Sequence, residues 1–230
     1  MFIKGTVRKP NVEEGLFEEL ERVRGSPVRE TIEKRMEEFR EAGKGGEERW
    51  FSELCFCILT ANYTAHGGIR IQNELGAEGF CNLPEKELVK RLKELGHRFY
   101  NMRGIFIAEA RGKKVKESLR KVCGGKLETG NWRRETEMRE WLVENIKGLG
   151  WKEASHFLRN LGYFDLAIID RHILSILKKY GYISEVPKAL GKKKYLEIEG
   201  ILDGIAKKAG MSQGELDLYL WYMKTGKVLK

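Results

Sequence analysis

The chain has 230 residues, of which 41% are apolar and 33% charged, so it can form a sizeable core in one or two domains. No apolar run reaches the roughly 20 residues that a membrane-spanning helix needs, and the first residues lack an apolar segment of signal-peptide length, so we expect a cytoplasmic protein with no membrane partner. The net charge of +9 favours a polyanionic partner, although a merely basic soluble protein would carry the same charge.

The first third of the chain is predicted to be helical. Apolar residues recur every three or four positions in two successive stretches, at Val12, Leu16, Leu20 and Val23 and then at Val28, Ile32, Met36 and Phe39. Ser26-Pro27 predicts the start of the second helix, with a capping hydroxyl before a proline at the first helical position. Residues 43–46 end it, and residues 50–61, apolar on most sides, predict a buried central helix.

The remainder of the chain also follows helical periodicity. We expect a helix from near Pro84 to Gly96, a long amphipathic stretch over residues 99–119, and a glycine-containing loop over residues 123–131. Further helices are expected over residues 136–147, 152–161, 171–180 and 197–209, with a short loop or strand at residues 166–169. Ser212 to Glu215 is a capping box that opens the last helix, and Gly226 follows it. The expected fold class is all-α, with two lobes of helices.

The segment between two of these helices, Gly148-Leu149-Gly150, is typical of a tight turn that binds an anion. Two glycines permit a close backbone approach, and we expect the amides after Gly148 to be unpaired at the start of the next helix, where they favour a phosphate. Many helix pairs that bind nothing are also joined by glycines, so the turn alone leaves the function open.

Lys152 and Asp170 add chemistry to this turn. Lys152 lies in the first helical turn after it, where the helix field favours the neutral, nucleophilic amine, although a solvated surface lysine is the ordinary alternative. Asp170 precedes the next helix and is a preferred N-cap residue. A carboxylate held there can also stabilise positive charge that develops on a sugar ring, and both roles are compatible.

The residues from Gly148 to Ala154 and from Ile168 to His172 together resemble the signature of the helix-hairpin-helix DNA glycosylases with a Gly/Pro-Asp loop. Residues 59–65, Leu-Thr-Ala-Asn-Tyr-Thr-Ala, are similar to a segment of the endonuclease III branch. Ile169 departs from the motif, which has a small residue or proline before the aspartate. The chain resembles most the second-type 8-oxoguanine DNA glycosylases of archaea and bacteria, because it is short and ends in lysine nine positions after Trp221.

The resemblance implies an arrangement of lobes and a reaction. One lobe is expected to comprise residues 1–65 with 171–230, and the other residues 66–170, including the hairpin at about 136–162, with the active site in the cleft between them. The enzyme would extrude 8-oxoguanine from double-stranded DNA, form a Schiff base through Lys152, and cleave the strand by β-elimination, also at abasic sites. Asp170 would orient Lys152. A nucleoid-associated monomer is expected.

The resemblance also implies further site residues. Trp221 would stack on the extruded base, although it is equally a core aromatic, and the opposite face would meet Phe99, Tyr100 or, preferably, Met102. The terminal carboxylate of Lys230 would accept hydrogen bonds from guanine, and Asp217, on the same helix face as Trp221, would touch the base or lie on a solvated face. Asn62 would fill the space that the base leaves, and Gly148 and Gly150 would contact DNA.

No iron–sulfur cluster or other cofactor is expected, because no cysteine follows Cys123 to form the C-terminal cluster loop of related enzymes. Cys55, Cys57, Cys81 and Cys123 lack paired spacing and are expected as reduced thiols. The four histidines show no metal-ligand spacing. The family implies only a sodium or potassium ion on the backbone carbonyls of the hairpin, at the positions of Glu144, Ile146 and Leu149.

Two alternatives remain open from the sequence. A relative that removes another oxidised base, as endonuclease III does, would keep the same hairpin and differ in its base pocket. A non-catalytic helix-hairpin-helix protein would use the hairpin only to grip phosphates, and would need neither Lys152 nor Asp170 at this spacing.

Overall fold

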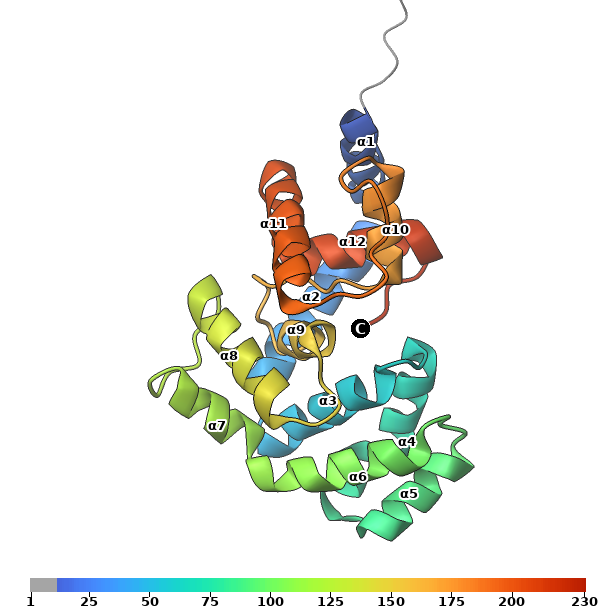
Figure 1. Cartoon of the computed structure of the whole chain (residues 1–230), viewed down its shortest axis with the longest axis vertical. Coiled ribbons are helices and arrows are strands. Elements are labelled where there is room, and N and C mark those ends of the chain that lie inside the picture. The colour runs from blue at the N-terminus through green and yellow to red at the C-terminus, as the bar shows by residue number, and fades with distance from the viewer. Residues whose placement is uncertain (1–11) are drawn as a thin grey trace, which may run out of the picture.

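The computed structural model describes residues 12–230, and in this part of the chain all regular structure is helical (Figure 1). The α-helices are α1 (Val12–Arg24), α2 (Val28–Lys44), α3 (Glu47–Thr60), α4 (Ala65–Asn82), α5 (Glu85–Glu94), α6 (Tyr100–Ala110), α7 (Val115–Val122), α8 (Trp132–Asn145), α9 (Trp151–Arg159), α10 (Arg171–Lys179), α11 (Lys192–Ala209) and α12 (Gln213–Thr225). A short 3-10 helix, η1 (Arg111–Lys113), follows α6. The expected all-α fold is confirmed, and none of the described helices is long and apolar enough to cross a bilayer.

The buried apolar side chains form two clusters, which correspond to the two groups of helices in Figure 1. The first draws on residues 42–166, and the second on residues 16–39 and 167–220. The lobes expected from the sequence, residues 1–65 with 171–230 and residues 66–170, differ from these clusters mainly at residues 42–65. Those residues bury their apolar side chains in the first cluster, and residues 1–11 of the expected lobe lie outside the described part of the chain.

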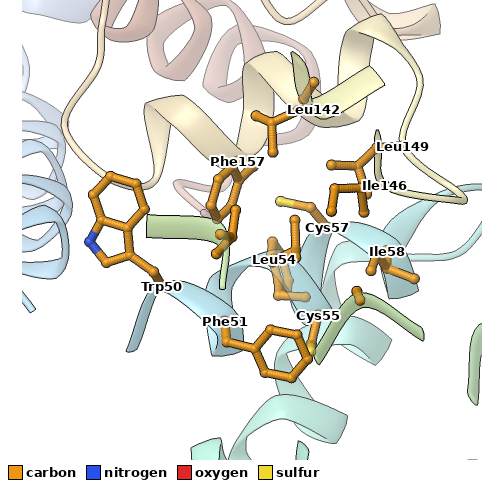
Figure 2. Packing of buried hydrophobic residues seen from close by; sticks show 14 of the residues in the cluster. Trp50, Phe51, Leu54, Cys55, Cys57, Ile58, Leu142, Ile146, Leu149 and Phe157 are labelled. Carbon is orange, nitrogen blue, oxygen red and sulfur yellow. The ribbon is translucent and has the colours of Figure 1, made fainter. Parts of the chain in front are cut away.

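Helix α3 is the buried centre of the first cluster, as its sequence predicted. Every residue from Trp50 to Thr60 is buried, so the helix is covered on all sides. Figure 2 shows Leu54 and Cys57 beneath the side chains that α8, α9 and their connection contribute, Leu142, Ile146, Leu149 and Phe157. The hairpin that carries Lys152 is therefore supported by a continuous apolar layer. The four cysteines are unpaired.

Several predicted elements differ from the structure. The stretch over residues 99–119 is broken at Lys114, whose φ is +41°, into α6, η1 and α7. Helix α4 was not expected, since its glycines have low helix propensity, but Gly68 allows it to approach α3 closely: a Cβ there would lie 2.7 Å from the Thr60 methyl group. Ser26 does not cap α2, because its hydroxyl donates to the carbonyl of Val23.

A buried ion pair joins the two groups of helices behind the hairpin. Arg139 of α8 and Glu199 of α11 form two hydrogen bonds of 2.5 and 2.8 Å, and both side chains are almost fully buried. The Arg139 guanidinium lies 4.5 Å from the ring centroid of Trp151, and Glu199 also accepts from the amide of Ala167 at 3.0 Å. The start of α9 and the loop before Asp170 thus share one rigid support.

Glu135 links the start of α8 to the same loop and predicts a pH dependence of stability. Its carboxylate is fully buried and accepts from the amides of Gly130 and Asp165 at 3.2 and 2.9 Å. Burial and then the charge of Asp165 raise its pKa from 4.5 to about 7. The folded protein therefore binds more protons than the unfolded chain between these values, and the free energy of unfolding falls as pH rises through this window.

We expect Glu135→Gln to remove this pH dependence. At about 1.4 kcal/mol per pKa unit, the effect amounts to about 3 kcal/mol between about pH 4.5 and pH 7. Thermal unfolding of the wild-type and variant proteins across this range measures it. The difference in stability between the two proteins should shift in favour of the variant as pH rises, and a constant difference would contradict the assignment.

Candidate active site

The connection between α8 and α9 is a tight turn that requires glycine. Helix α8 ends at Asn145, and Gly148 has a φ of +86°, a left-handed conformation that strains other residues. A Cβ at this position would also lie 2.6 Å from a ring carbon of Phe106 and 3.0 Å from a guanidinium nitrogen of Arg103. Gly150 precedes α9 in an extended conformation. The turn predicted from the sequence is confirmed.

The amides of the turn itself are paired, contrary to the expectation that those after Gly148 are free. The Leu149 amide donates to the Ile146 carbonyl at 3.3 Å, and the Gly150 amide to the Glu153 carboxylate at 3.2 Å. Glu153 occupies the third position of α9 and closes the turn by itself. An anion at this hairpin would therefore meet the first amides of α9, which have no carbonyl partner within the helix.

We expect Gly148→Ala to destabilise the hairpin by about 1–3 kcal/mol, because the left-handed backbone and the contact with Phe106 both oppose a Cβ. The affinity for duplex DNA should fall with it. Thermal unfolding and DNA titration measure the two effects. Gly112→Ala is the matched control, since Gly112 has no positive φ and a Cβ there meets no neighbouring atom. Equal behaviour of the two variants would contradict a structural need for glycine in the turn.

Lys152 is the second residue of α9, and its side chain is 27% exposed. Its ammonium lies 3.7 Å from a Glu153 oxygen, and this is its only ion pair within 4.0 Å among residues 12–230. The amine is therefore accessible and loosely held. The Trp151 and Arg139 contacts behind it fix the helix start from which it projects.

Asp170 is the N-cap of α10, as predicted. Its Oδ1 accepts from the amides of His172 and Ile173 at 2.8 and 2.9 Å, and the preceding residues Ile168 and Ile169 are buried. The carboxyl group is thereby fixed at the helix start, while Oδ2 accepts no hydrogen bond within the described part of the chain. One oxygen is used for structure and the other remains available for chemistry.

Asp217 connects Lys152 and Asp170 electrostatically. Burial raises the pKa of Asp217 to about 6, Arg159 opposes this shift, and the charges of Asp170 and Lys152 act on it in opposite directions. Its side chain is 12% exposed and lies 3.3 Å from the Arg159 guanidinium. Asp217 is therefore not on a solvated face, and both Lys152 and Asp170 lie within electrostatic range of it.

Trp221 lies one helical turn after Asp217 on α12 and contacts His172, the second residue of α10. The rings of Trp221 and His172 meet edge-on, with centroids 4.8 Å apart. The indole nitrogen is buried and has no hydrogen-bond partner among the described residues. The start of α10 and the middle of α12 thus bring together His172, Trp221, Asp217 and Asp170.

Met102 lies on α6, in the other group of helices, and the residue is 46% exposed. Of the other two candidates, Phe99 has the guanidinium of Arg98 4.5 Å from its ring centroid, and Tyr100 has the Lys93 ammonium at 5.6 Å. Met102 presents the more open apolar surface. Its stacking opposite Trp221 stays a prediction.

Asn62 lies at the turn between α3 and α4 with its backbone held in a strained shape. It is exposed, and its φ of +59° is left-handed, a conformation that asparagine tolerates better than most residues. The neighbouring carbonyls are fixed: that of Ala61 accepts from Arg103 at 2.8 Å, and that of Leu59 lies 2.9 Å from Nε2 of His97. Asn62 is therefore exposed on a turn whose neighbouring backbone is held in place by side chains of other elements.

Lys230 is anchored by its side chain, which the sequence did not predict. Its ammonium lies 2.9 Å from each oxygen of Glu53 and 4.5 Å from the ring centroid of Phe56, both on α3. The end of the chain therefore lies between the two groups of helices, where Figure 1 marks it. A cavity of about 440 Å³ opens beside it, lined among others by Arg35, Arg49, Glu53, Gln72 and Lys230. Of the predicted base-contacting residues, only Lys230 lines this cavity.

Sequence reasoning missed several buried polar residues near this end of the chain. His156 and Arg159 follow Lys152 at helical spacing on α9, and both are almost fully buried. Burial, followed by the charges of Arg159, Lys152 and Lys230, holds the pKa of His156 well below its usual value. Their spacing of four and seven positions from Lys152 indicates that both residues lie on the same face of α9 as Lys152. Within residues 12–230, no group of three or more His, Cys, Asp or Glu side chains is placed to hold a metal ion.

Comparison with known proteins gives consistent results. A family described as 8-oxoguanine DNA glycosylase matches residues 32–211. An 8-oxoguanine DNA glycosylase/AP lyase of Methanocaldococcus jannaschii is 51% identical over 216 residues, which is 94% of this chain and 99% of that protein. A protein of the same description from a Thermotoga species is 48% identical over 94% of this chain and all of that protein.

Solved structures agree with these sequences. The crystal structure of the M. jannaschii 8-oxoguanine glycosylase/lyase in complex with a 15mer DNA containing 8-oxoguanine has a TM-score of 0.86 and 51% identity, covering 94% of this chain and 100% of that one. The structure of the Thermotoga maritima 8-oxoguanine DNA glycosylase has a TM-score of 0.84 and 48% identity, covering 95% of this chain and 100% of that one.

Proposed function

Because the chain belongs to the 8-oxoguanine DNA glycosylase family, we propose how its residues perform the glycosylase/AP lyase reaction. The protein is an 8-oxoguanine DNA glycosylase/AP lyase of the archaeal and bacterial type. Its substrate is double-stranded DNA that contains 8-oxoguanine or an abasic site. The observation that carries the proposal is the position of Lys152 and Asp170 at the starts of two helices, α9 and α10, where the charges of both act on the carboxyl group of Asp217.

The chemistry begins with the amine of Lys152. As the free base it attacks C1′ of the extruded nucleotide, the C1′–N9 bond breaks, and the base departs with the bond's electron pair and takes up a proton. The sugar ring opens to a Schiff base between lysine and C1′. Loss of a proton from C2′ then expels the 3′ phosphate by β-elimination. The exposure of Lys152 and its single long ion pair leave the amine free for this attack.

Asp170 supplies the negative charge. Hydrogen bonds from the His172 and Ile173 amides fix its carboxyl group through Oδ1 before the substrate binds, so no reorganisation is needed when positive charge develops on the sugar. Its Oδ2 faces no donor of the described chain. We assign to this oxygen the stabilisation of the cationic sugar and the orientation of Lys152.

The base pocket lies between Trp221 and Met102, with the terminal carboxylate of Lys230 as the acceptor for guanine. Support comes from the buried, unpartnered indole nitrogen of Trp221, the open surface of Met102, and the anchoring of the chain end between the two groups of helices. Asn62, exposed on the turn between α3 and α4, occupies the space that the extruded base vacates. There it hydrogen-bonds the nucleotide that was paired with that base.

DNA is held by the hairpin through Gly148, Gly150 and the first amides of α9. A sodium or potassium ion would bind the carbonyls of Glu144, at the end of α8, and of Ile146 and Leu149, in the turn that follows. The Ile146 carbonyl also accepts from the Leu149 amide at 3.3 Å. Such an ion would extend the positive field toward a phosphate. The proposed enzyme uses no other cofactor.

A borohydride trap with duplexes that carry one defined lesion each tests the assignment. Reduction of the Schiff base should link the protein covalently to DNA containing 8-oxoguanine and to abasic DNA, but not to undamaged DNA. Preferential trapping on an oxidised pyrimidine would favour the endonuclease III-like alternative. Binding without trapping on any duplex would favour a non-catalytic DNA-binding protein.

A further inference from the structure

Glu53 is a carboxylate buried in an otherwise apolar segment of α3. Its side chain is 1% exposed, and its two oxygens each lie 2.9 Å from the ammonium of Lys230. The amides of Gln72 and Asn160 donate to it at 3.3 and 3.2 Å, and the Arg49 guanidinium approaches to 3.5 Å. The Glu53 carboxylate is therefore well hydrogen-bonded and paired with a cation. Removing the Lys230 ammonium would leave a buried negative charge without its main partner, which is energetically unfavourable.

The cation that it receives belongs to the last residue of the chain. Helix α12 ends at Thr225, and Lys230 lies beyond it with a side chain that is only 15% exposed. Chain ends are usually poorly ordered unless specific contacts hold them. Here the contacts are made by the tip of a long side chain. The terminal carboxylate, at the other end of the same residue, is not used in this ion pair, and the ion pair tethers it near α3.

The anchored residue lies close to the reacting amine. The Phe56 ring lies 4.5 Å from the Lys230 ammonium and meets His156 edge-on with centroids 5.6 Å apart. His156 follows Lys152 by one helical turn on the same face of α9. Two side chains, Phe56 and His156, therefore lie between the Lys230 ammonium and Lys152.

We propose that Glu53 is a positioning residue for base recognition: by holding the ammonium of Lys230 it fixes the terminal carboxylate beside the extruded 8-oxoguanine. The proposal rests on the proposed function, since it needs a base pocket next to Lys152. Glu53 itself does not touch the substrate. Because the ion pair orders the chain end before DNA binds, the cost of ordering it does not reduce the affinity for the base.

Glu53→Gln and Lys230→Met test this role, because each breaks the ion pair and neither removes the carboxylate at the chain end. We expect both to lower single-turnover excision of 8-oxoguanine by about tenfold to a hundredfold, the range for a group displaced by about 1 Å. Strand cleavage at a preformed abasic site by the Glu53→Gln protein should stay at the wild-type rate, since that substrate has no base to recognise. For Glu53→Gln, this lyase reaction also reports that the variant is folded and that the proposed function holds. Thermal unfolding reports whether Lys230→Met is folded.

Two further variants separate positioning from mere structure. Lys230→Arg retains the cation and should recover most of the lost excision, and the double variant Glu53→Gln, Lys230→Met should lose no more than either single one. Glu197→Gln and Lys194→Met are the matched controls, because these residues form an exposed ion pair of 2.8 Å on α11. Both controls should excise 8-oxoguanine normally.

Three outcomes would overturn the proposal: unchanged excision in Glu53→Gln and Lys230→Met, additive losses in the double variant, or a parallel loss of excision and abasic-site cleavage in folded variants. The last result would mean that the ion pair supports the structure of the site as a whole and has no specific role in base recognition. If the wild-type protein lacked both activities, the proposed function itself would be refuted. That result differs from any of the three outcomes that would refute only the positioning role of Glu53.

Discussion

Asp170→Asn lowers the rate of 8-oxoguanine excision by about a hundredfold to a thousandfold, the usual cost of removing one preorganised electrostatic group from an active site. Asparagine retains the oxygen that accepts from the His172 and Ile173 amides, so the cap of α10 persists. Only the negative charge near the sugar is lost. Single-turnover excision kinetics measure the effect.

The same variant should leave the protein's stability almost unchanged, because asparagine and aspartate are equally good N-cap residues. Asp170→Ala is the informative companion: it removes both the cap and the charge, and should cost about 1 kcal/mol of unfolding free energy in addition to activity. An Asp170→Asn protein with the wild-type excision rate would show that the carboxylate serves the fold alone.

Lys152→Gln should abolish borohydride trapping and reduce base excision on the order of 10⁴-fold or more, as expected when an enzyme loses its nucleophile. No other amine is assigned to take its place. The side chain is partly exposed and makes one long ion pair, with Glu153, so the variant should fold and bind duplex DNA nearly as well as the wild-type protein. Trapping, excision and DNA titration are measured on the same preparation.

Lys147→Gln is the control that separates chemistry from charge. Lys147 lies on the same hairpin, is exposed, and pairs with Glu109 at 3.0 Å, so its replacement removes one positive charge near the DNA without touching the site. Trapping should persist in this variant. Equal losses in the two variants would mean that the hairpin lysines act through phosphate binding alone.

Local patterns were sufficient to predict much of the local structure around the candidate site. The two turn glycines, the capping position of Asp170 and the burial of α3 from Trp50 onward depend on residues close in sequence, where backbone geometry and apolar periodicity act directly. The resemblance to a glycosylase family added the roles of Lys152 and Asp170. Family membership and the all-α fold followed as expected.

The remaining features depend on contacts between distant parts of the chain. Glu53 and Lys230 are 177 positions apart, and Arg139 and Glu199 are 60 apart, so no local pattern indicates either pair. Helix α4 has a glycine-rich sequence that disfavours an isolated helix, and only its close packing on α3 explains it. Asp217 was expected to touch the base or to lie on a solvated face. Its position beside Arg159 depends on the packing of α12 against α9, which no local pattern indicates.

Peptide mapping of the trapped complex tests the central assignment most directly. The wild-type protein is incubated with duplex DNA containing 8-oxoguanine in borohydride, digested with a protease and a nuclease, and analysed by mass spectrometry. The account predicts a reduced sugar adduct on the peptide that contains Lys152. An adduct on another lysine, or efficient removal of the base with no adduct at all, would contradict it.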